Sequence, residues 1–172
     1  SSDGGDALTR LKTLRERFYK NTRFIADRMA ESGNACSSAL SELRVPLLSS
    51  LMGGIDSGYD MRDTVNQGTK YNGSGCLIHG LTVVSDSLVA VDHLLGEHPE
   101  WAERLITALK NDFREDDEIK HYLISCPKFG NNDDEADNEA VDVANKVSAI
   151  VSGEKNYLGN AFRPDFSTPS TH

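Results

Sequence analysis

The stretch Cys126-Pro127-Lys128-Phe129-Gly130-Asn131-Asn132-Asp133-Asp134-Glu135-Ala136-Asp137 joins an apolar segment to a dense run of carboxylates. A proline and a Gly-Asn pair separate the two, which predicts a tight turn. Asp133, Asp134 and Glu135 are predicted to lie in the first turn of the following helix, because the helix dipole favours negative charge there. That helix is predicted from about Asp134 to Ser152, with Gly153 as its stop.

The same acidic run can be compared with a calcium-binding loop. Such a loop needs glycine at its sixth position and a bidentate carboxylate at its twelfth. Counted from Asn131 the sixth residue is Ala136, and counted from Asp133 the twelfth is Ala144. The pattern therefore favours a solvated helix start over a metal site.

Apolar residues at steps of three and four predict helices upstream. A long amphipathic helix is predicted from Asp6 to about Ser32, with Asp6 as N-cap and Gly33-Asn34 as its end. Cys76–Leu95 is the best candidate for a buried helix, and Gly80 near its start suggests close approach of another backbone. Other helices are predicted at Cys36–Leu43, at Leu47–Met52 after Pro46, at Glu100–Phe113 after Pro99, and from Asp116 or Asp117 to Leu123.

The remaining stretches, residues 56–75 and 156–172, contain turn residues or prolines and are predicted to be loop or extended chain. The length of 172 residues fits one domain or a piece of a larger one. No signal peptide and no apolar run of about 18 residues is visible, which predicts a soluble, cytoplasmic chain with no membrane partner.

The formal net charge of −9 argues against a nucleic-acid partner, which would require clustered Lys and Arg. The one basic concentration, residues 10–28, spreads around a helical wheel. It is typical of a solvated surface or of an interface with an acidic protein.

The cysteines and histidines form no recognisable catalytic or metal-binding pattern. Cys36, Cys76 and Cys126 have no metal-ligand spacing, and the last two adjoin apolar runs, which favours inert buried thiols. The histidines are scattered, and no nucleophile elbow is present. The five histidines are His79, His93, His98, His121 and His172.

Three segments in order resemble the glycyl radical enzymes, the pyruvate formate-lyase-like family. Val45–Gly54 is similar to that family's proline-led short helix. Gln67–Gly73, followed by Val84–Ala90, looks like its Gly-x-x-Tyr-Asn turn and Ala-Asp-Ser-Leu-Ala helix, with Ser85 in place of the first alanine. Pro127–Asp137 is similar to its Pro-Lys-Phe-Gly-Asn-Asp-Asp stretch, with Asn132 in place of an aspartate.

The resemblance implies one segment, residues 1–172, of a pyruvate formate-lyase-like domain, with a long helix at 6–34 and a matched core at 40–172. The whole fold would be an α/β barrel of ten strands surrounded by helices, of which this segment is mainly α-helical with one or two short strands. The implied chemistry uses a glycyl radical, installed by a radical-SAM activating enzyme, and a cysteine thiyl radical. The substrate would be a small organic molecule whose C–C, C–O, C–N or C–S bond is cleaved, as in formate C-acetyltransferase or diol dehydratases.

None of the family's catalytic parts maps onto this chain. Cys36 does not match the catalytic cysteine loop, and the radical glycine loop would lie far downstream. The resemblance places only Ser170 and His172 near a substrate cavity. The first hypothesis is therefore that the chain is a segment of such an enzyme, inactive alone and dependent on the remainder of the enzyme. A homo-oligomer is also possible under this hypothesis. The alternatives are a subunit of a divided glycyl radical enzyme, a non-enzymatic helical interaction module, and an unrelated helical domain.

Overall fold

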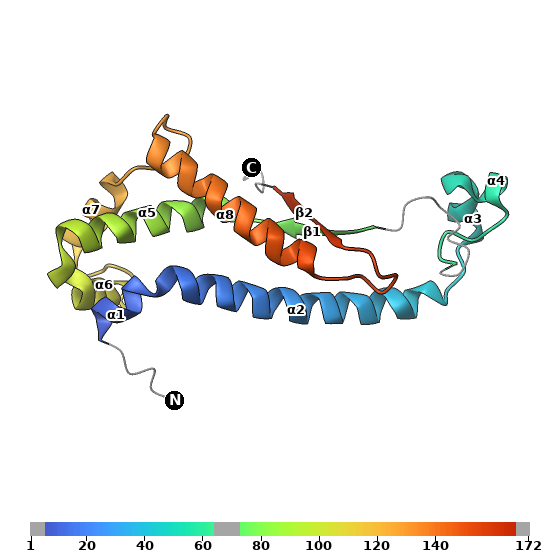
Figure 1. Ribbon diagram of the computed structural model, residues 1–172, viewed down its shortest axis with the longest axis horizontal. Coiled ribbons are helices and arrows are strands. Elements are labelled where there is room, and N and C mark those ends of the chain that lie inside the picture. The colour runs from blue at the N-terminus through green and yellow to red at the C-terminus, as the bar shows by residue number, and fades with distance from the viewer. Residues whose placement is uncertain (1–5, 64–72, 168–172) are drawn as a thin grey trace. The chain divides into compact units, whose positions relative to one another are not determined.

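The computed structural model describes residues 6–63 and 73–167 (Figure 1). Its elements are α1 (Ala7–Lys12), α2 (Leu14–Ser41), α3 (Pro46–Ser49), η1 (Ser50–Gly54), α4 (Ile55–Ser57), β1 (Ser74–Ile78), α5 (Leu81–Glu97), η2 (Pro99–Trp101), α6 (Ala102–Lys110), α7 (Asp117–Ser125), α8 (Asp134–Gly153) and β2 (Phe162–Phe166). The prediction of a mainly helical chain with one or two short strands is confirmed.

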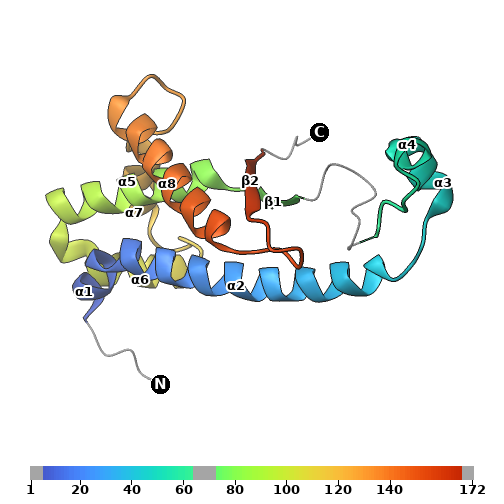
Figure 2. The same ribbon diagram turned by 45° about the vertical axis from the view of Figure 1, so that its right-hand side comes forward.

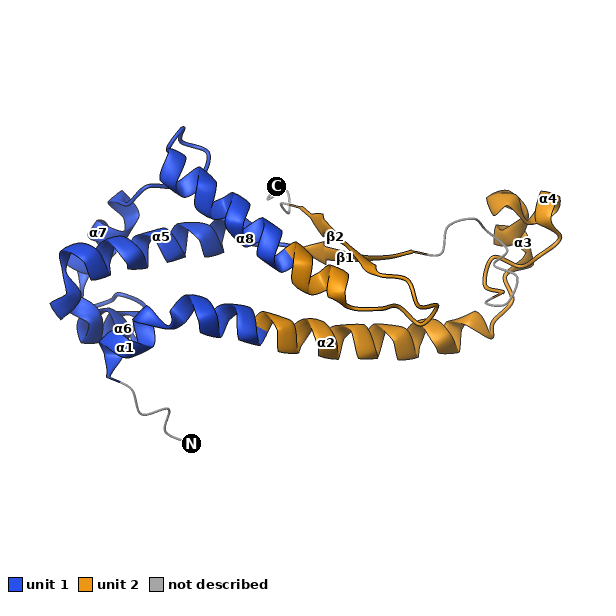
Figure 3. Cartoon of the chain, in the orientation of Figure 1, with its two compact units in different colours: residues 1–21, 79–147, 168–172 blue, residues 22–78, 148–167 orange. Residues whose placement is uncertain are grey.

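The chain divides into two compact units (Figure 3). Unit 1 comprises residues 1–21, 79–147 and 168–172, and unit 2 comprises residues 22–78 and 148–167. None of the helices in the described ranges combines the length and apolar character needed to cross a membrane.

Unit 1 contains the main hydrophobic core. α1 packs on α5 and α6, and α7 packs on α5. The buried side chains at the centre are Ala7, Leu11, Leu94, Ala102, Leu105 and Ile119. Leu94 and Ile119 are fully buried, and each apolar group removed from water in this way stabilises the fold. This core explains why short helices such as α1 and α6, marginal by themselves, are ordered here.

The part of α8 in unit 1 buries one stripe. Ala136, Ala140, Val143 and Val147 recur at steps of four, three and four, and all are buried. This is the 3.6-residue periodicity that predicted the helix. Its predicted range, Asp134 to Ser152 with a stop at Gly153, agrees with the observed one within a residue.

Unit 2 contains a two-stranded parallel sheet. β1 and β2 lie side by side in both views (Figures 1 and 2), with Ser74 opposite Phe162 and Ile78 opposite Phe166. The Ser167 amide donates to the Ile78 carbonyl at 3.1 Å and extends the pairing by one bond. The predicted extended tail is therefore a strand over part of its length.

Asn156 orders the turn that precedes β2. Its side chain is buried, and its Oδ1 accepts hydrogen bonds from the amides of Leu158 and Asn160 at 3.1 and 2.9 Å. Its Nδ2 donates to the Ser74 hydroxyl at 3.1 Å, at the first residue of β1. One buried amide thus links the turn before β2 to the start of its partner strand.

The prediction for the long N-terminal helix was right about where it starts, but wrong about its continuity and its end. Asp6 caps α1 by accepting from the Thr9 amide at 2.7 Å, as predicted. The helix breaks at Thr13, which leaves helical geometry while its hydroxyl bonds the Thr9 carbonyl at 3.0 Å. α2 then passes through Gly33 and Asn34 and continues to Ser41, so most of the helix predicted separately at Cys36–Leu43 is the end of α2. Asn34 lies inside the helix, and its side chain donates to the Lys155 carbonyl at 2.8 Å.

The prediction of a helix at Cys76–Leu95 placed its start too early. Cys76–Ile78 belongs to β1, and α5 starts at Leu81. Gly80 was predicted to allow close approach of another backbone, but a Cβ there would meet nothing within 4 Å. Its φ of 82° is the reason for glycine, because side-chain-bearing residues rarely adopt that conformation.

The other helix starts follow local rules. Pro46 and Pro99 occupy first-turn positions of α3 and η2 as predicted. Asp116 caps α7, with its side chain accepting from the Ile119 amide at 3.2 Å. Beyond α3, Gly53 turns to a φ of 93°, and the backbone then resumes as α4, an additional turn that the sequence did not predict.

Candidate functional site

The residues of the Cys126–Asp137 stretch form a turn held from both sides by carboxylates. The Phe129 amide donates to Asp86 Oδ1 on α5 at 2.8 Å. The Gly130 amide donates to Asp137 Oδ1 on α8 at 3.0 Å. Gly130 and Asn132 have φ values of 85° and 59°, a left-handed conformation that Gly and Asn tolerate best. The turn therefore needs both its residue types and the two carboxylates.

Asp86 belongs to the Val84–Ala90 segment, and Phe129 belongs to the Pro127–Asp137 segment. The hydrogen bond between them joins two of the three segments that carried the family resemblance. Ser85, the position where the resemblance expects alanine, is fully buried, and its hydroxyl donates to the Thr82 carbonyl at 3.1 Å. The extra hydroxyl is thus satisfied inside the helix.

Lys128 and Asp133 bind backbone groups of the two helices that the turn joins, α7 and α8. Lys128 Nζ donates to the carbonyls of Leu123 and Cys126 at 2.9 and 2.6 Å, which satisfies acceptors left open at the end of α7. Asp133 Oδ1 accepts from the amides of Glu135 and Ala136 at 3.1 and 3.2 Å and so caps α8. Asp134, Glu135 and Asp137 lie in the first turn. Asp133 was predicted inside that turn and is instead the residue before it.

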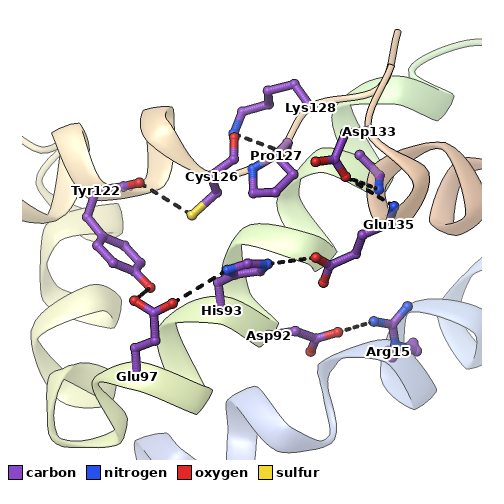
Figure 4. Close-up of polar contacts among 11 residues, drawn as sticks. Arg15, Asp92, His93, Glu97, Tyr122, Cys126, Pro127, Lys128, Asp133 and Glu135 are labelled. Carbon is purple, nitrogen blue, oxygen red and sulfur yellow. Dashed lines mark hydrogen bonds and ion pairs between the residues drawn. The ribbon is translucent and has the colours of Figure 1, made fainter. Parts of the chain in front are cut away.

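His93 lies between two carboxylates (Figure 4). Its Nε2 is 3.0 Å from Glu135 Oε2 on α8, and its Nδ1 is 3.7 Å from Glu97 Oε1 on α5. Glu97 also accepts a hydrogen bond from the Tyr122 hydroxyl at 2.9 Å. The hydrogen bond with Glu135 raises the pKa of His93 above its ordinary value, and Glu97 adds to the rise against the effect of desolvation.

The pKa values of two neighbouring acids, Tyr122 and Cys126, are raised, which favours their neutral forms. Burial and the bond with Glu97 raise the pKa of Tyr122 to about 12. The Cys126 thiol donates to the Tyr122 carbonyl at 3.3 Å, and burial raises the pKa of that thiol. Because the thiolate is the reactive form, Cys126 is a structural thiol, in agreement with the prediction. Cys76 is half-buried in β1, and Cys36 is exposed on α2.

Arg15 pairs with carboxylates of two helices. It pairs with Asp92 on α5 (Figure 4) and also with Glu139 on α8. Desolvation lowers the pKa of Arg15, but the two carboxylates outweigh it and the net shift is upward. Asp92 and His93 are neighbours in sequence but have different partners. In the structure, Asp92 pairs with Arg15 and His93 with Glu135.

The predicted substrate-side residues, Ser170 and His172, lie outside the described residues, as does most of the Gln67–Gly73 segment. The described chain reaches them through β2, which ends at Phe166. Among residues 6–63 and 73–167, no group of three His, Cys, Asp or Glu side chains is arranged to hold a metal ion.

Chemically, four polar side chains at this turn bind backbone groups. Asp86, Asp133 and Asp137 accept from amides, and Lys128 donates to carbonyls. The Cys126–Asp137 junction therefore sets the relative placement of α5, α7 and α8. Sequence reasoning recognised the stretch but missed Asp86 and His93 as its partners, because neither contact is local in sequence.

A family model described as pyruvate formate lyase-like matches residues 5–172. The chain belongs to the pyruvate formate lyase-like family. Its relatives include a glycyl radical enzyme of Archaeoglobus fulgidus, whose crystal structure matches 90% of this chain at 27% identity and a TM-score of 0.78, over 20% of that chain. The resemblance to glycyl radical enzymes is thereby confirmed.

Other pyruvate formate lyase-like relatives are named as dehydratases. The trans-4-hydroxy-L-proline dehydratase of Clostridioides difficile is 26% identical over 164 residues, which is 92% of this chain and 20% of that protein. The glycerol-bound B12-independent glycerol dehydratase of Clostridium butyricum is 30% identical, with a TM-score of 0.79, over 90% of this chain and 20% of that one. The chain thus spans about a fifth of the length of the relatives it matches.

Proposed function

We propose that this chain is part of a glycyl radical enzyme that eliminates water from a small hydroxylated substrate. The supporting observation is that relatives named for dehydration of hydroxyproline and of glycerol align over at least 90% of the chain. A dehydratase breaks a C–O bond, so this reaction is favoured over the C–C, C–N and C–S cleavages that the family resemblance leaves open. Acyl transfer of the formate C-acetyltransferase type is the second candidate from that resemblance.

The chain's own contribution is structural support. Its described cysteines are the exposed Cys36, the half-buried Cys76 and the buried Cys126, whose thiol is bonded to a carbonyl. None of them lies in the cysteine-loop pattern of the family. We therefore assign the thiyl cysteine, the radical glycine and the activating radical-SAM enzyme to polypeptide outside these 172 residues.

Ser170 and His172 are proposed to border the substrate. They follow β2 by a few residues, and β2 is placed by its pairing with β1 and by the Asn156 turn. A hydroxyl and an imidazole suit recognition of a hydroxylated substrate, because both groups donate and accept hydrogen bonds.

The test compares this chain with the longer protein formed by adding the polypeptides encoded on either side of it. Both are incubated anaerobically with a radical-SAM activating enzyme and then with glycerol, 1,2-propanediol or trans-4-hydroxy-L-proline. A glycyl radical signal in electron paramagnetic resonance and loss of water from one substrate are expected for the longer protein alone. A radical signal from the chain by itself, or a longer protein that forms no radical, would contradict the proposal.

A further inference from the structure

The unit 2 part of α2 exposes a row of large apolar side chains. Ile25, Met29 and Leu40 are 54, 60 and 50% exposed, and Cys36 is also exposed. At about 100° per residue, their spacing of four, seven and four places all of them along one narrow stripe of the helix. These residues, Ile25, Met29, Cys36 and Leu40, are called the α2 stripe.

A different face of α2 makes the contacts inside unit 2. Ala30 is buried, and Asn34 donates to the Lys155 carbonyl. The helix therefore turns small and polar residues toward its own unit and large apolar residues toward solvent. Single exposed apolar residues are ordinary, but an aligned row of them marks an interaction surface.

Further exposed apolar side chains lie on α3, η1 and α4 in the same unit. Leu47, Leu51 and Ile55 are 80, 77 and 78% exposed, and the break in helical geometry at Met52 and Gly53 separates Ile55 from the other two. Unit 2 therefore exposes apolar side chains on more than one element.

A second copy of the chain fits the α2 stripe poorly. Helices that pair as a two-stranded coiled coil repeat apolar residues at the a and d positions along their seam. Ser32 is exposed at the position between Met29 and Cys36 where that register needs an apolar residue. The remaining part of the family fold fits better, because relatives of the same fold carry about four-fifths of their length outside the region that this chain matches.

We propose that the α2 stripe is the surface by which unit 2 packs against the rest of the pyruvate formate lyase-like fold. This assignment rests on the proposed function, because it takes the partner to be the remainder of that enzyme. Burying four apolar side chains along one helix gives the association a hydrophobic driving force that surface charges cannot supply.

Cys36 provides a natural probe of this surface. N-ethylmaleimide labelling followed by mass spectrometry measures the alkylation rate of each cysteine in the 172-residue chain and in the longer protein. The rate at Cys36 is expected to fall about tenfold or more in the longer protein, since reaction then requires local opening. Cys126, already buried, is expected to react slowly in both. An unchanged rate at Cys36 would overturn the assignment.

A pair of variants tests the stripe without depending on its cysteine. Ile25→Gln with Met29→Gln is expected to weaken binding of the chain to the separately produced flanking polypeptides by about tenfold or more. Ala35→Gln with Ser38→Gln, on an exposed face of α2 away from the stripe, is the matched control and is expected to bind as the unchanged chain does. Equal losses in both pairs would contradict the proposal.

Separate readouts distinguish the failure of this inference from the failure of the proposed function. A longer protein that forms its radical and turns over substrate while Cys36 stays reactive would leave the function standing and remove the interface. A concentration-dependent dimer of the chain alone that protects Cys36 would assign the stripe to a second copy and overturn the proposal. Absence of both binding and radical formation would remove the function and the interface together.

Discussion

At the scale of single residues, the acidic side chains around the Cys126–Asp137 junction serve the backbone. Asp133 caps α8, Asp137 holds the Gly130 amide, and Asp86 holds the Phe129 amide from a different helix. A hydrogen bond from an amide to a carboxylate is stronger than one between neutral groups. These residues are therefore expected to matter for stability.

Asp86→Ala tests this role. Loss of the bond to the Phe129 amide is expected to lower the free energy of unfolding by about 1–2 kcal/mol, because the amide loses a charged partner. Urea denaturation measures the change. Asp117→Ala removes an exposed carboxylate in the first turn of α7 and is expected to cost less than about 0.5 kcal/mol. Equal effects of the two changes would show that Asp86 does not hold the turn.

His93 is expected to make stability depend on pH. Its pKa is raised in the folded chain, mainly by Glu135 and also by Glu97, so the stabilisation is complete below the ordinary pKa of 6.5. It is lost as the pH rises through the raised folded-state pKa. Urea denaturation from pH 5.5 to 8.5 should therefore show a fall in unfolding free energy that His93→Gln reduces.

The control for this measurement is His121→Gln, which changes an exposed histidine on α7 whose ring bonds a carbonyl of its own helix. This variant leaves the His93–Glu135 pair intact, so a fall in unfolding free energy over the same pH range is still expected. A His93→Gln chain with the original pH dependence would refute the role of the His93–Glu135 pair.

At the scale of elements, glycines have different consequences in different helices. Gly33 lies inside α2 without a left-handed backbone, whereas Gly80 precedes α5 with a φ of 82°. The Gly-Asn pair at 33–34 therefore does not end its helix, and Gly80 marks the start of the next. Residue type alone does not separate these cases, because glycine permits a left-handed conformation without requiring it.

Gly80→Ala and Gly96→Ala are expected to have opposite effects. Alanine at Gly80 must adopt a left-handed conformation and should lower the unfolding free energy by about 1–2 kcal/mol. Alanine at Gly96, inside α5 with nothing within 4 Å of the added Cβ, should raise it by up to about 1 kcal/mol. Thermal denaturation followed by circular dichroism gives the sign of each change. Stabilisation by both substitutions would contradict the observed backbone at Gly80.

At the scale of the whole molecule, burial is unevenly distributed between the units. The main core cluster lies in unit 1 and includes Leu94, Leu105 and Ile119. Unit 2 holds the sheet and the Asn156 turn, and it also carries the α2 stripe and the exposed apolar side chains of α3, η1 and α4. Unit 2 is thus the part with more apolar surface left for a further partner.

Leu94→Ala and Leu47→Ala are predicted to lower the free energy of unfolding by very different amounts. Leu94 is fully buried in the unit 1 core, so its truncation should cost about 2–5 kcal/mol by lost burial and a residual cavity. Leu47 is 80% exposed, and its truncation should cost less than about 0.5 kcal/mol in this chain. Chemical denaturation of the two variants measures both values, and a large loss from Leu47→Ala would show that its surface is already covered.

Local signals predicted several elements well. The caps Asp6 and Asp116, the prolines at 46 and 99, and the periodicity of α8 depend on neighbours within about one helical turn, and the structure has them where expected. The family match followed from ordered motifs and is confirmed by the family model. The proposed roles of Ser170 and His172 stay predictions, since both lie beyond the described residues.

Other features could not be predicted locally, because they depend on residues that are distant in the sequence. Cys76–Ile78 has an apolar pattern compatible with a helix, and only the parallel pairing with β2 makes it a strand. Glu135 and Asp86 meet His93 and Phe129 across 42 and 43 positions of sequence, so no local pattern shows the contacts.

The sequence by itself determined the family, the mainly helical character and most helix starts, because capping, proline geometry and helical periodicity act over a few neighbouring residues. The tertiary structure alone decided the β1–β2 register, the continuity of α2 through Gly33, and the carboxylate contacts that hold the Cys126–Asp137 junction. The physical reason is that a hydrogen bond or a buried side chain depends on which segments fold together, and that choice is made by the packing of the whole chain.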